Sequence, residues 1–290
     1  MCDTSHPEGA EGPVFPVPYV PTLGPMHPDA ITPGLWDQVV GVSGTGRFLP
    51  HDKDARWGGA KAEHVLVDHV RVDDGQAAVP TLLQRGTRRT VRLHLYGDGD
   101  FDQGAEHAAK LAADLGADRA QLVRLTSEAQ RGRCCRIQLR TFAPGTEVPE
   151  AEGATGLDQL PEPVRDTWPI FAEEMAGEGF AFLAAQEQAG ALDGPVLVVV
   201  EAGRVVGAIG PMAPRPDPLG RARLLPQYFG VLPSHRGRGH GRASWRAAMG
   251  WGYRSGAAYQ LLQTELGGAS DRLCQGEGLA TLGFITTADV

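Results

Sequence analysis

The segment from Gln227 to Gly256 constrains the fold most, because its hydrophobic period changes from that of a strand to that of a helix. A short apolar run ends at Pro233 and is followed by a basic, glycine-rich turn. Apolar residues then recur at the i, i+3, i+4, i+7 and i+8 spacing of one buried helical face. These positions are Trp245, Ala248, Met249, Gly252 and Tyr253. The segment therefore predicts a strand, a loop and a helix in succession.

The turn between the predicted strand and helix combines glycines with positive charge. Glycine lets the backbone come close to a ligand, and the first amides of a helix lack intrahelical partners and carry partial positive charge. Such a turn is suited to hold a phosphate. In a sequence with 39 glycines, the same pattern also fits a tight turn without a ligand. The turn consists of Arg236, Gly237, Arg238, Gly239, His240 and Gly241.

Two other phosphate-binding loops do not fit this turn. A nucleotide-binding P-loop requires Lys followed by Ser or Thr after the glycines, and neither is present. A dinucleotide-binding turn requires the spacing Gly-x-Gly-x-x-Gly, which Gly237, Gly239 and Gly241 do not have.

The turn resembles the acetyl-CoA signature of the GNAT superfamily of N-acetyltransferases in a run that reads Val231-x-Pro233-x-x-Arg236-Gly237-x-Gly239-x-Gly241. The core of that signature is Arg/Gln-x-x-Gly-x-Gly/Ala, which Arg236, Gly239 and Gly241 match directly. The order of predicted elements over residues 160–286 is also similar to the GNAT core. The resemblance implies an α/β (α+β) fold with a mixed, mostly antiparallel sheet flanked by helices.

Three regions are predicted along the chain. Residues 1–34 are rich in proline and predict an arm or a disordered leader. Residues 35–145 predict an N-terminal α/β block, which is a small separate domain or a degenerate copy of the C-terminal one. A polar, Gly- and Pro-rich linker over 143–156 leads to a GNAT-like domain over 157–290. Within the block, strands are predicted at 90–96, 121–125 and 135–142, with a helix at 105–115.

The GNAT-like region is predicted to begin with two helices, at 164–175 and 179–190. A hairpin at 195–209, a strand at 223–231, a strand at 259–266 and a helical stretch at 270–283 follow. Since the sequence given stops at Val290, soon after Gly283-Phe284, the final hairpin of the family has no room. We expect the N-terminal block or a second subunit of a homodimer to supply the missing strand.

The resemblance implies mostly backbone roles for the signature. The amides from Gly237 to Arg242 would bind the pyrophosphate of acetyl-CoA or another acyl-CoA, and the Val231 amide would polarise the thioester oxygen. The implied cofactor-binding residues are Val231, Arg236, Gly237, Arg238, Gly239, His240, Gly241 and Arg242.

The residues that would move protons are less well defined. The family's usual acid tyrosine is replaced by Leu279 or, with an insertion, by Cys274, and its usual asparagine by Gly267 or Gly268. Cys274 is either the acid or a small buried thiol. Glu265 is the first candidate for the base, because partial burial at a strand end would raise its pKa, and a solvent-facing carboxylate is the alternative. The further candidates for the base are Tyr228 and Glu201.

Composition limits the partners. A net charge of −8 disfavours nucleic acid and anionic membranes. The sequence lacks a long apolar run and a signal-peptide pattern, and its four cysteines lack metal-ligand spacing. We therefore expect a cytoplasmic protein with free thiols and no metal. Glu173, Glu174 and Glu178 are interpreted as a solvated helix face, although in the family this region shapes the acceptor pocket and would favour a cationic amine.

Three hypotheses follow. The first is an N-acetyltransferase that moves an acetyl or other acyl group to a primary amine of a small molecule or peptide by direct attack in a ternary complex. The second is a non-catalytic acyl-CoA-binding sensor that has lost its acid. In the third, the N-terminal half carries the specific function.

Overall fold

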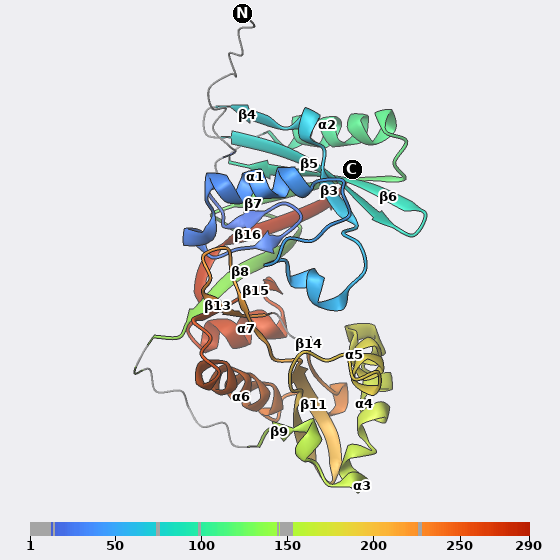
Figure 1. Cartoon of the computed structure of the whole chain (residues 1–290), viewed down its shortest axis with the longest axis vertical. Helices are drawn as coiled ribbons and strands as arrows, with labels where there is room; N and C mark the ends of the chain where they lie inside the picture. Colours follow the sequence, from blue (N-terminus) through green and yellow to red (C-terminus); the bar gives the residue numbers. More distant parts are fainter. Residues whose placement is uncertain are drawn as a thin grey trace, which may run out of the picture. The chain divides into compact units, whose positions relative to one another are not determined.

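The chain divides into two compact units in the computed structural model, which describes residues 13, 15–73, 76–97, 100–143, 145, 153–225 and 228–290. The first unit comprises Met1–Leu139 and Leu262–Val290, and the second comprises Arg140–Leu261. The second unit is therefore an insertion in the sequence of the first (Figure 1).

The first unit is built on a mostly antiparallel sheet, with the strand order β8-β16-β7-β6-β5-β3 and β4 beside β5. Helix α2 (Phe101–Asp114) connects β6 to β7, which are parallel, and packs against both (Figure 1). The strands are β3 (Glu63–Val65), β4 (Arg71–Asp73), β5 (Gln76–Arg85), β6 (Arg88–Tyr96), β7 (Arg119–Thr126), β8 (Arg133–Thr141) and β16 (Ala280–Asp289).

The amphipathic pattern of α2 explains how it covers the sheet. Asp100 caps the helix, because its side chain accepts hydrogen bonds from the amides of Asp102 at 2.8 Å and Gln103 at 3.3 Å. Alanine and leucine side chains on one face of the helix pack into a core with apolar residues of β6 and β7. This core includes Val91, Leu93, Ala108, Leu111, Ala112 and Leu122.

The described residues of the predicted N-terminal arm pack into the first unit. Phe15 lies 4.8 Å from Tyr96 and 5.7 Å from Trp36 between ring centroids, and the Tyr96 hydroxyl donates to the Tyr19 carbonyl at 2.8 Å. From Phe15 onward this segment is not a disordered leader, because its aromatic side chains bury apolar area; residues 1–12 and 14 lie outside the described residues. Its elements are β1 (Tyr19–Val20), β2 (Gly24–Pro25), η1 (Pro28–Ala30), and α1 (Pro33–Val42), followed by η2 (Lys53–Trp57) and η3 (Val67–His69).

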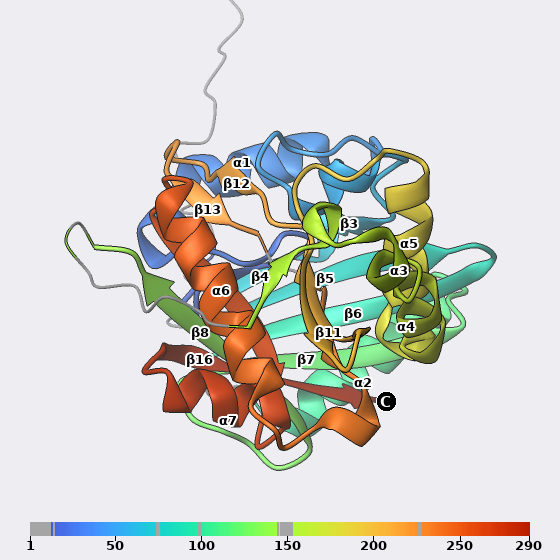
Figure 2. The same ribbon diagram turned by 90° about the horizontal axis from the view of Figure 1, so that it is seen from below.

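The second unit holds a four-stranded antiparallel sheet with the order β14-β11-β10-β9. Helices α4 and α5 lie on one side of it and α6 on the other (Figure 2). The elements are β9 (Thr155–Gly156), η4 (Leu157–Gln159), α3 (Glu162–Arg165), α4 (Trp168–Glu174), η5 (Ala176–Glu178), α5 (Phe180–Gln188), β10 (Leu197–Glu201), β11 (Arg204–Gly210), β14 (Tyr228–Val231), η6 (Pro233–His235) and α6 (His240–Arg254).

A smaller group of strands completes the second unit. Strand β13 (Ala222–Leu224) pairs antiparallel with β12 (Pro214–Pro216) and parallel with the start of β15 (Tyr259–Glu265). The single strand predicted at 223–231 is therefore wrong: it divides into β13 and β14, which pair with different neighbours. Most of the predicted linker, at 144 and 146–152, lies outside the described residues.

The C-terminal prediction also needs correction. Helix α7 (Ala269–Gly276) ends earlier than predicted, because Gly278 takes a positive φ of 78° that terminates it. Gly283 and Phe284 lie inside β16, which pairs antiparallel with β7 and β8. The N-terminal block thus supplies neighbours on both sides of this strand, and residues 262–290 group with the first unit instead of the predicted C-terminal domain.

The β10–β11 turn yields a stability prediction. Ala202 (φ 50°) and Gly203 (φ 76°) join the paired residues Glu201 and Arg204, and two positive φ values are what a type I′ turn requires. Ala202→Asn creates the preferred Asn-Gly turn, so we expect the free energy of unfolding to rise by about 0.5–1 kcal/mol. Gly203→Ala should lower it by a similar amount. Urea unfolding midpoints measure both changes, and equal effects of the same sign would contradict this explanation.

Candidate functional site

The backbone N–H and C=O groups of Val231 do not bond to the neighbouring strand of its sheet. The Leu232 amide donates to the Val206 carbonyl at 2.9 Å, so the adjacent pair Val231 and Gly207 is a non-hydrogen-bonded one. The N–H and C=O of Val231 therefore point away from β11, and β14 is the edge strand of this sheet among the described residues. In agreement with this direction, the Val231 carbonyl accepts a hydrogen bond from Nε of Arg236 at 3.0 Å.

The loop after β14 exposes backbone instead of side chains. Gly237 and Gly239 have φ values of 80° and 89°, which disfavour any residue with a Cβ. A Cβ built on either glycine would have no atom within 4 Å, so the space beside this backbone is open. Gly239 is the N-cap of α6 and offers no capping side chain. The first turn of α6 thus presents uncapped amides, as the sequence predicts for a phosphate-binding loop.

The arginines of the signature are paired with carboxylates from other elements. Arg236 donates to Glu178 at 3.2 Å, and Arg238 donates to Glu201 at 2.8 Å. Glu178 is therefore not a purely solvated residue of a helix face, and Glu174 likewise forms an ion pair with Arg204. The acidic helical segment is in part a set of counter-ions, which weakens the expectation that it selects a cationic acceptor.

Glu201 is the centre of a charged cluster, which we call the Glu201 cluster and which comprises Glu201, His235, Arg238 and His240. The Nε2 atom of His240 lies 2.8 Å from Oε2 of Glu201, and Nε2 of His235 lies 4.0 Å from the same oxygen. The hydrogen bond from His240, aided by Arg238, lowers the pKa of the Glu201 carboxyl group below its usual range. The carboxylate is thus ionised near neutral pH beside the predicted phosphate site.

Tyr228 lies on the face of β14 that meets α5. Its ring is packed over Gly179, where an added Cβ would lie 2.4 Å from the tyrosine Cε1 atom. The ring centroids of Phe180 and Phe182 are each 6.2 Å from that of Tyr228. By strand alternation, Val231 lies on the opposite face, toward Gly241 at the start of α6. The predicted role of Tyr228 as a base stays a prediction.

The other predicted proton-transfer residues, Glu265 and Cys274, belong to the first unit. Cys274 is buried, with 2% of its surface exposed, and burial, with the nearby charges of Asp271 and Glu277, raises the pKa of its thiol to about 12. This burial fits the alternative of a small packed thiol better than an acid that meets solvent. Glu265 is exposed at the end of β15, so the expected partial burial is wrong and the alternative of a solvent-facing carboxylate is confirmed. Its carbonyl accepts a hydrogen bond from the Gly268 amide at 2.9 Å.

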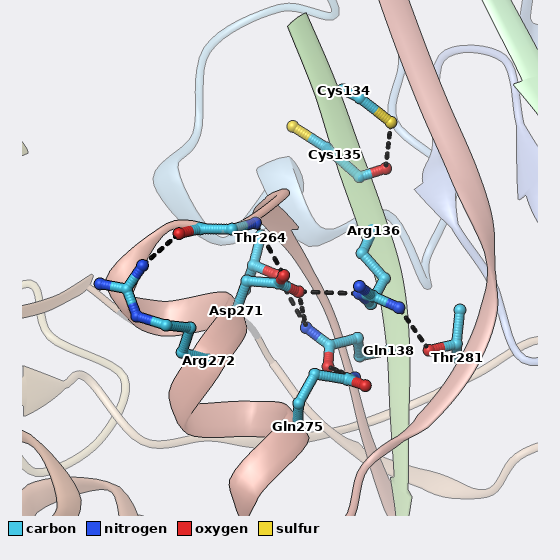
Figure 3. Close-up of polar contacts among 10 residues, drawn as sticks. Cys134, Cys135, Arg136, Gln138, Thr264, Asp271, Arg272, Gln275 and Thr281 are labelled. Carbon is cyan, nitrogen blue, oxygen red and sulfur yellow. Dashed lines mark hydrogen bonds and ion pairs between the residues drawn. The ribbon is translucent and has the colours of Figure 1, made fainter. Parts of the chain in front are cut away.

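A buried polar network holds the turn between β15 and α7 (Figure 3). Asp271 accepts hydrogen bonds from Arg136 Nε at 2.9 Å, Thr264 Oγ1 at 3.2 Å and the Gly267 amide at 2.9 Å. Gln138, which is fully buried, donates to Thr264 at 2.7 Å and to Asp271 at 3.3 Å. Burial raises the pKa of Asp271, but the hydrogen bonds from Gly267 and Arg136 outweigh it and leave this pKa lowered.

The structure thus gives two carboxylates a contact that the sequence did not predict. Glu178 and Glu201 bind the arginines of the signature, whereas the sequence indicated a solvated helix face for Glu178 and a candidate base for Glu201. No group of three or more His, Cys, Asp and Glu side chains in the described ranges is arranged to hold a metal ion. Within the same ranges, every helix is too short or too polar to cross a bilayer.

Comparison with known proteins finds similar structures but no matching sequence family. No protein-family model matches, and no curated protein matches. A GCN5-related N-acetyltransferase from Sphaerobacter thermophilus is 15% identical, with a TM-score of 0.49, and the match covers 87% of this chain and 93% of that one.

Two further structures cover most of the chain. A tandem GNAT protein from the clavulanic acid biosynthesis pathway is 15% identical, with a TM-score of 0.44 and coverage of 88% of this chain and 94% of its own. A conserved protein of unknown function from Bacteroides thetaiotaomicron is 12% identical, with a TM-score of 0.41 and coverage of 91% and 100%.

The two signature glycines Gly239 and Gly241 are expected to respond differently to substitution. Gly239→Ala places a side chain at a φ of 89° and should cost about 1 kcal/mol of unfolding free energy. Gly241→Ala is the matched control, because Gly241 lies in helix α6 and its Cβ would make an ordinary 3.5 Å contact with Phe229 of β14. We expect a change within about 0.5 kcal/mol there. Thermal unfolding compares the two, and a larger loss for Gly241→Ala would contradict the described backbone.

The buried network gives a second prediction. Asp271→Asn should lower the unfolding free energy near pH 7 by about 2–3 kcal/mol, because it leaves Arg136 without a charged partner. A lowered carboxyl pKa stabilises the fold above the unfolded value of about 3.9. The difference between variant and wild type should therefore shrink as the pH falls below about 4. The matched control is Asp289→Asn, whose pair with Arg119 is exposed and screened by solvent, so this change should affect the unfolding free energy much less than Asp271→Asn does.

Proposed function

We propose that this protein is an acyl-CoA-dependent N-acyltransferase of the GNAT type. It transfers an acetyl group from acetyl-CoA to the primary amine of a small molecule or peptide. The observation that carries this proposal is the outward N–H of Val231 on an edge strand, followed directly by the open loop at Gly237 and Gly239. A donor for a thioester oxygen and a cradle for a diphosphate thus lie next to each other along one chain segment.

The residues of the signature would have different roles in binding and catalysis. The amides at the start of α6 would donate hydrogen bonds to the diphosphate, because they lack partners within the helix and the loop before them is open beside Gly237 and Gly239. Arg236 and Arg238 add positive charge. The Val231 amide donates a hydrogen bond to the thioester oxygen, and this bond strengthens as negative charge develops there during attack by the amine. When bound, the acyl-CoA thioester would supply the activated acyl group, and CoA would leave as a thiolate.

Proton transfer is the least constrained part of the mechanism. The attacking amine must be neutral and must lose a proton after the C–N bond forms, while the C–S bond breaks and the thiolate takes up a proton. Of the predicted bases, Tyr228 lies in the unit that carries the signature and is the candidate here, whereas Glu265 is exposed in the first unit and stays a prediction. Since Cys274 is buried and its pKa is raised, we assign protonation of the thiolate to solvent.

The first test is calorimetric titration with acetyl-CoA, followed by a thiol-release assay with a panel of amines. We expect a Kd in the micromolar range, about −8 kcal/mol, together with thiol release that depends on the amine. Binding without release for any amine would favour the non-catalytic sensor instead. The absence of both would contradict the proposal.

A backbone substitution tests the role assigned to Val231. Val231→Pro removes an N–H that the sheet does not use, so the edge strand should tolerate it. We expect kcat to fall about 100-fold with little change in CoA affinity, because one oxyanion donor is lost. Val231→Ala keeps the amide and should change kcat by less than about tenfold. If both variants lose the same activity, the side chain and not the amide is responsible.

A further inference from the structure

Glu201 occupies the loop in the way an anionic ligand would. Its Oε1 atom accepts from NH1 of Arg238 at 2.8 Å, and its Oε2 atom lies 2.8 Å from Nε2 of His240. An ionised carboxylate can only accept, so His240 is the donor in the second contact. Two signature side chains are therefore bound to one carboxylate that comes from the β10–β11 turn, outside the signature.

The contacts of Glu201 with the loop are partly buried, so this carboxylate is not simply solvated. About a third of the Glu201 side chain is exposed, whereas that of His240 is 18% exposed and that of His235 is 22% exposed. The turn that carries Glu201 is fixed by the pairing of Glu201 with Arg204 and by the strand register beyond it. The strand pairing thus fixes the backbone position from which the Glu201 carboxylate reaches the loop.

A ligand phosphate and the Glu201 carboxylate compete for the same donors. A phosphate that reaches Arg238 or His240 must replace a charge-assisted hydrogen bond and must also lie near a negative charge. A diphosphate gains several new contacts with the α6 amides and arginines, which offset this loss. A singly charged anion or a lone phosphate gains fewer and is disfavoured by the same carboxylate.

We propose that Glu201 is a specificity-determining residue that acts as an internal competitor in the phosphate loop. It lowers the affinity of the loop for all anions and thereby restricts binding to ligands with a diphosphate, such as CoA esters. This inference rests on the proposed function for the identity of the ligand. It does not depend on catalysis, because it concerns only the charges around Arg238 and His240.

The test compares Glu201→Gln with the wild-type protein by calorimetric titration at low ionic strength and about pH 8, where carboxylates are ionised and free histidines neutral. The probes are CoA, inorganic pyrophosphate and inorganic phosphate. We expect Glu201→Gln to bind CoA and pyrophosphate about three- to tenfold more tightly, since one repulsive charge is removed. Binding of inorganic phosphate should strengthen by a larger factor, since equal factors would leave the preference for a diphosphate unchanged.

Glu174→Gln is the matched control. It removes the same charge from an ion pair with Arg204, which is outside the signature loop, and should change each Kd by less than about twofold. Equal strengthening in both variants would overturn the inference, because a general charge effect would then explain it. Unchanged or weaker binding in Glu201→Gln would also overturn it, since Glu201 would then serve to position Arg238 and His240.

The pyrophosphate titration separates the two proposals. If the wild-type protein binds pyrophosphate but not CoA, the proposed function fails while the effect of Glu201 is still decided by the variant. If CoA binds and Glu201→Gln has no effect on either probe, only the role of Glu201 fails. If neither protein binds any of the three probes, both proposals fail.

Discussion

The hydrogen bond from the Leu232 amide to the Val206 carbonyl fixes the register on which the candidate site depends. In an antiparallel ladder, a shift by one residue exchanges bonded and non-bonded pairs and turns every side chain to the other face. With the observed register, the amide of Val231 faces outward, Tyr228 meets α5, and Val231 meets α6. A shift by one residue would direct the Val231 amide into the sheet and leave the loop without an adjacent donor.

The strand, loop and helix of the signature could be predicted because their signals are local. Apolar spacing defined the buried face of α6, and the glycines marked backbone that requires positive φ. The contact of Glu201 with Arg238 and His240 could not be predicted in this way. It follows only from the strand order, in which β11 is antiparallel to β14 and brings the hairpin turn beside the end of the signature strand. Strand order is a property of the whole chain and leaves no local pattern.

The prediction for the C-terminal region was wrong for a related reason. Residues 280–289 have too little alternation to identify a strand, and their neighbours β7 and β8 are distant in the sequence. The helical pattern before them was therefore extended too far, past the glycine at which α7 ends. Polar residues also gave no local signal of their position. Gln138, Thr264 and Asp271 look like surface residues in the sequence, yet they are buried. Their burial is possible because their side chains form hydrogen bonds with one another.

The insertion of the second unit into the first has a consequence for how the protein is made. Strand β16 separates β7 from β8 in the sheet, but it is translated only after the whole of the second unit. During synthesis, the second unit can close its own four-stranded sheet first, whereas β7 and β8 must wait for the strand that lies between them. The first unit is thus the first to begin on the ribosome and the last whose sequence is complete.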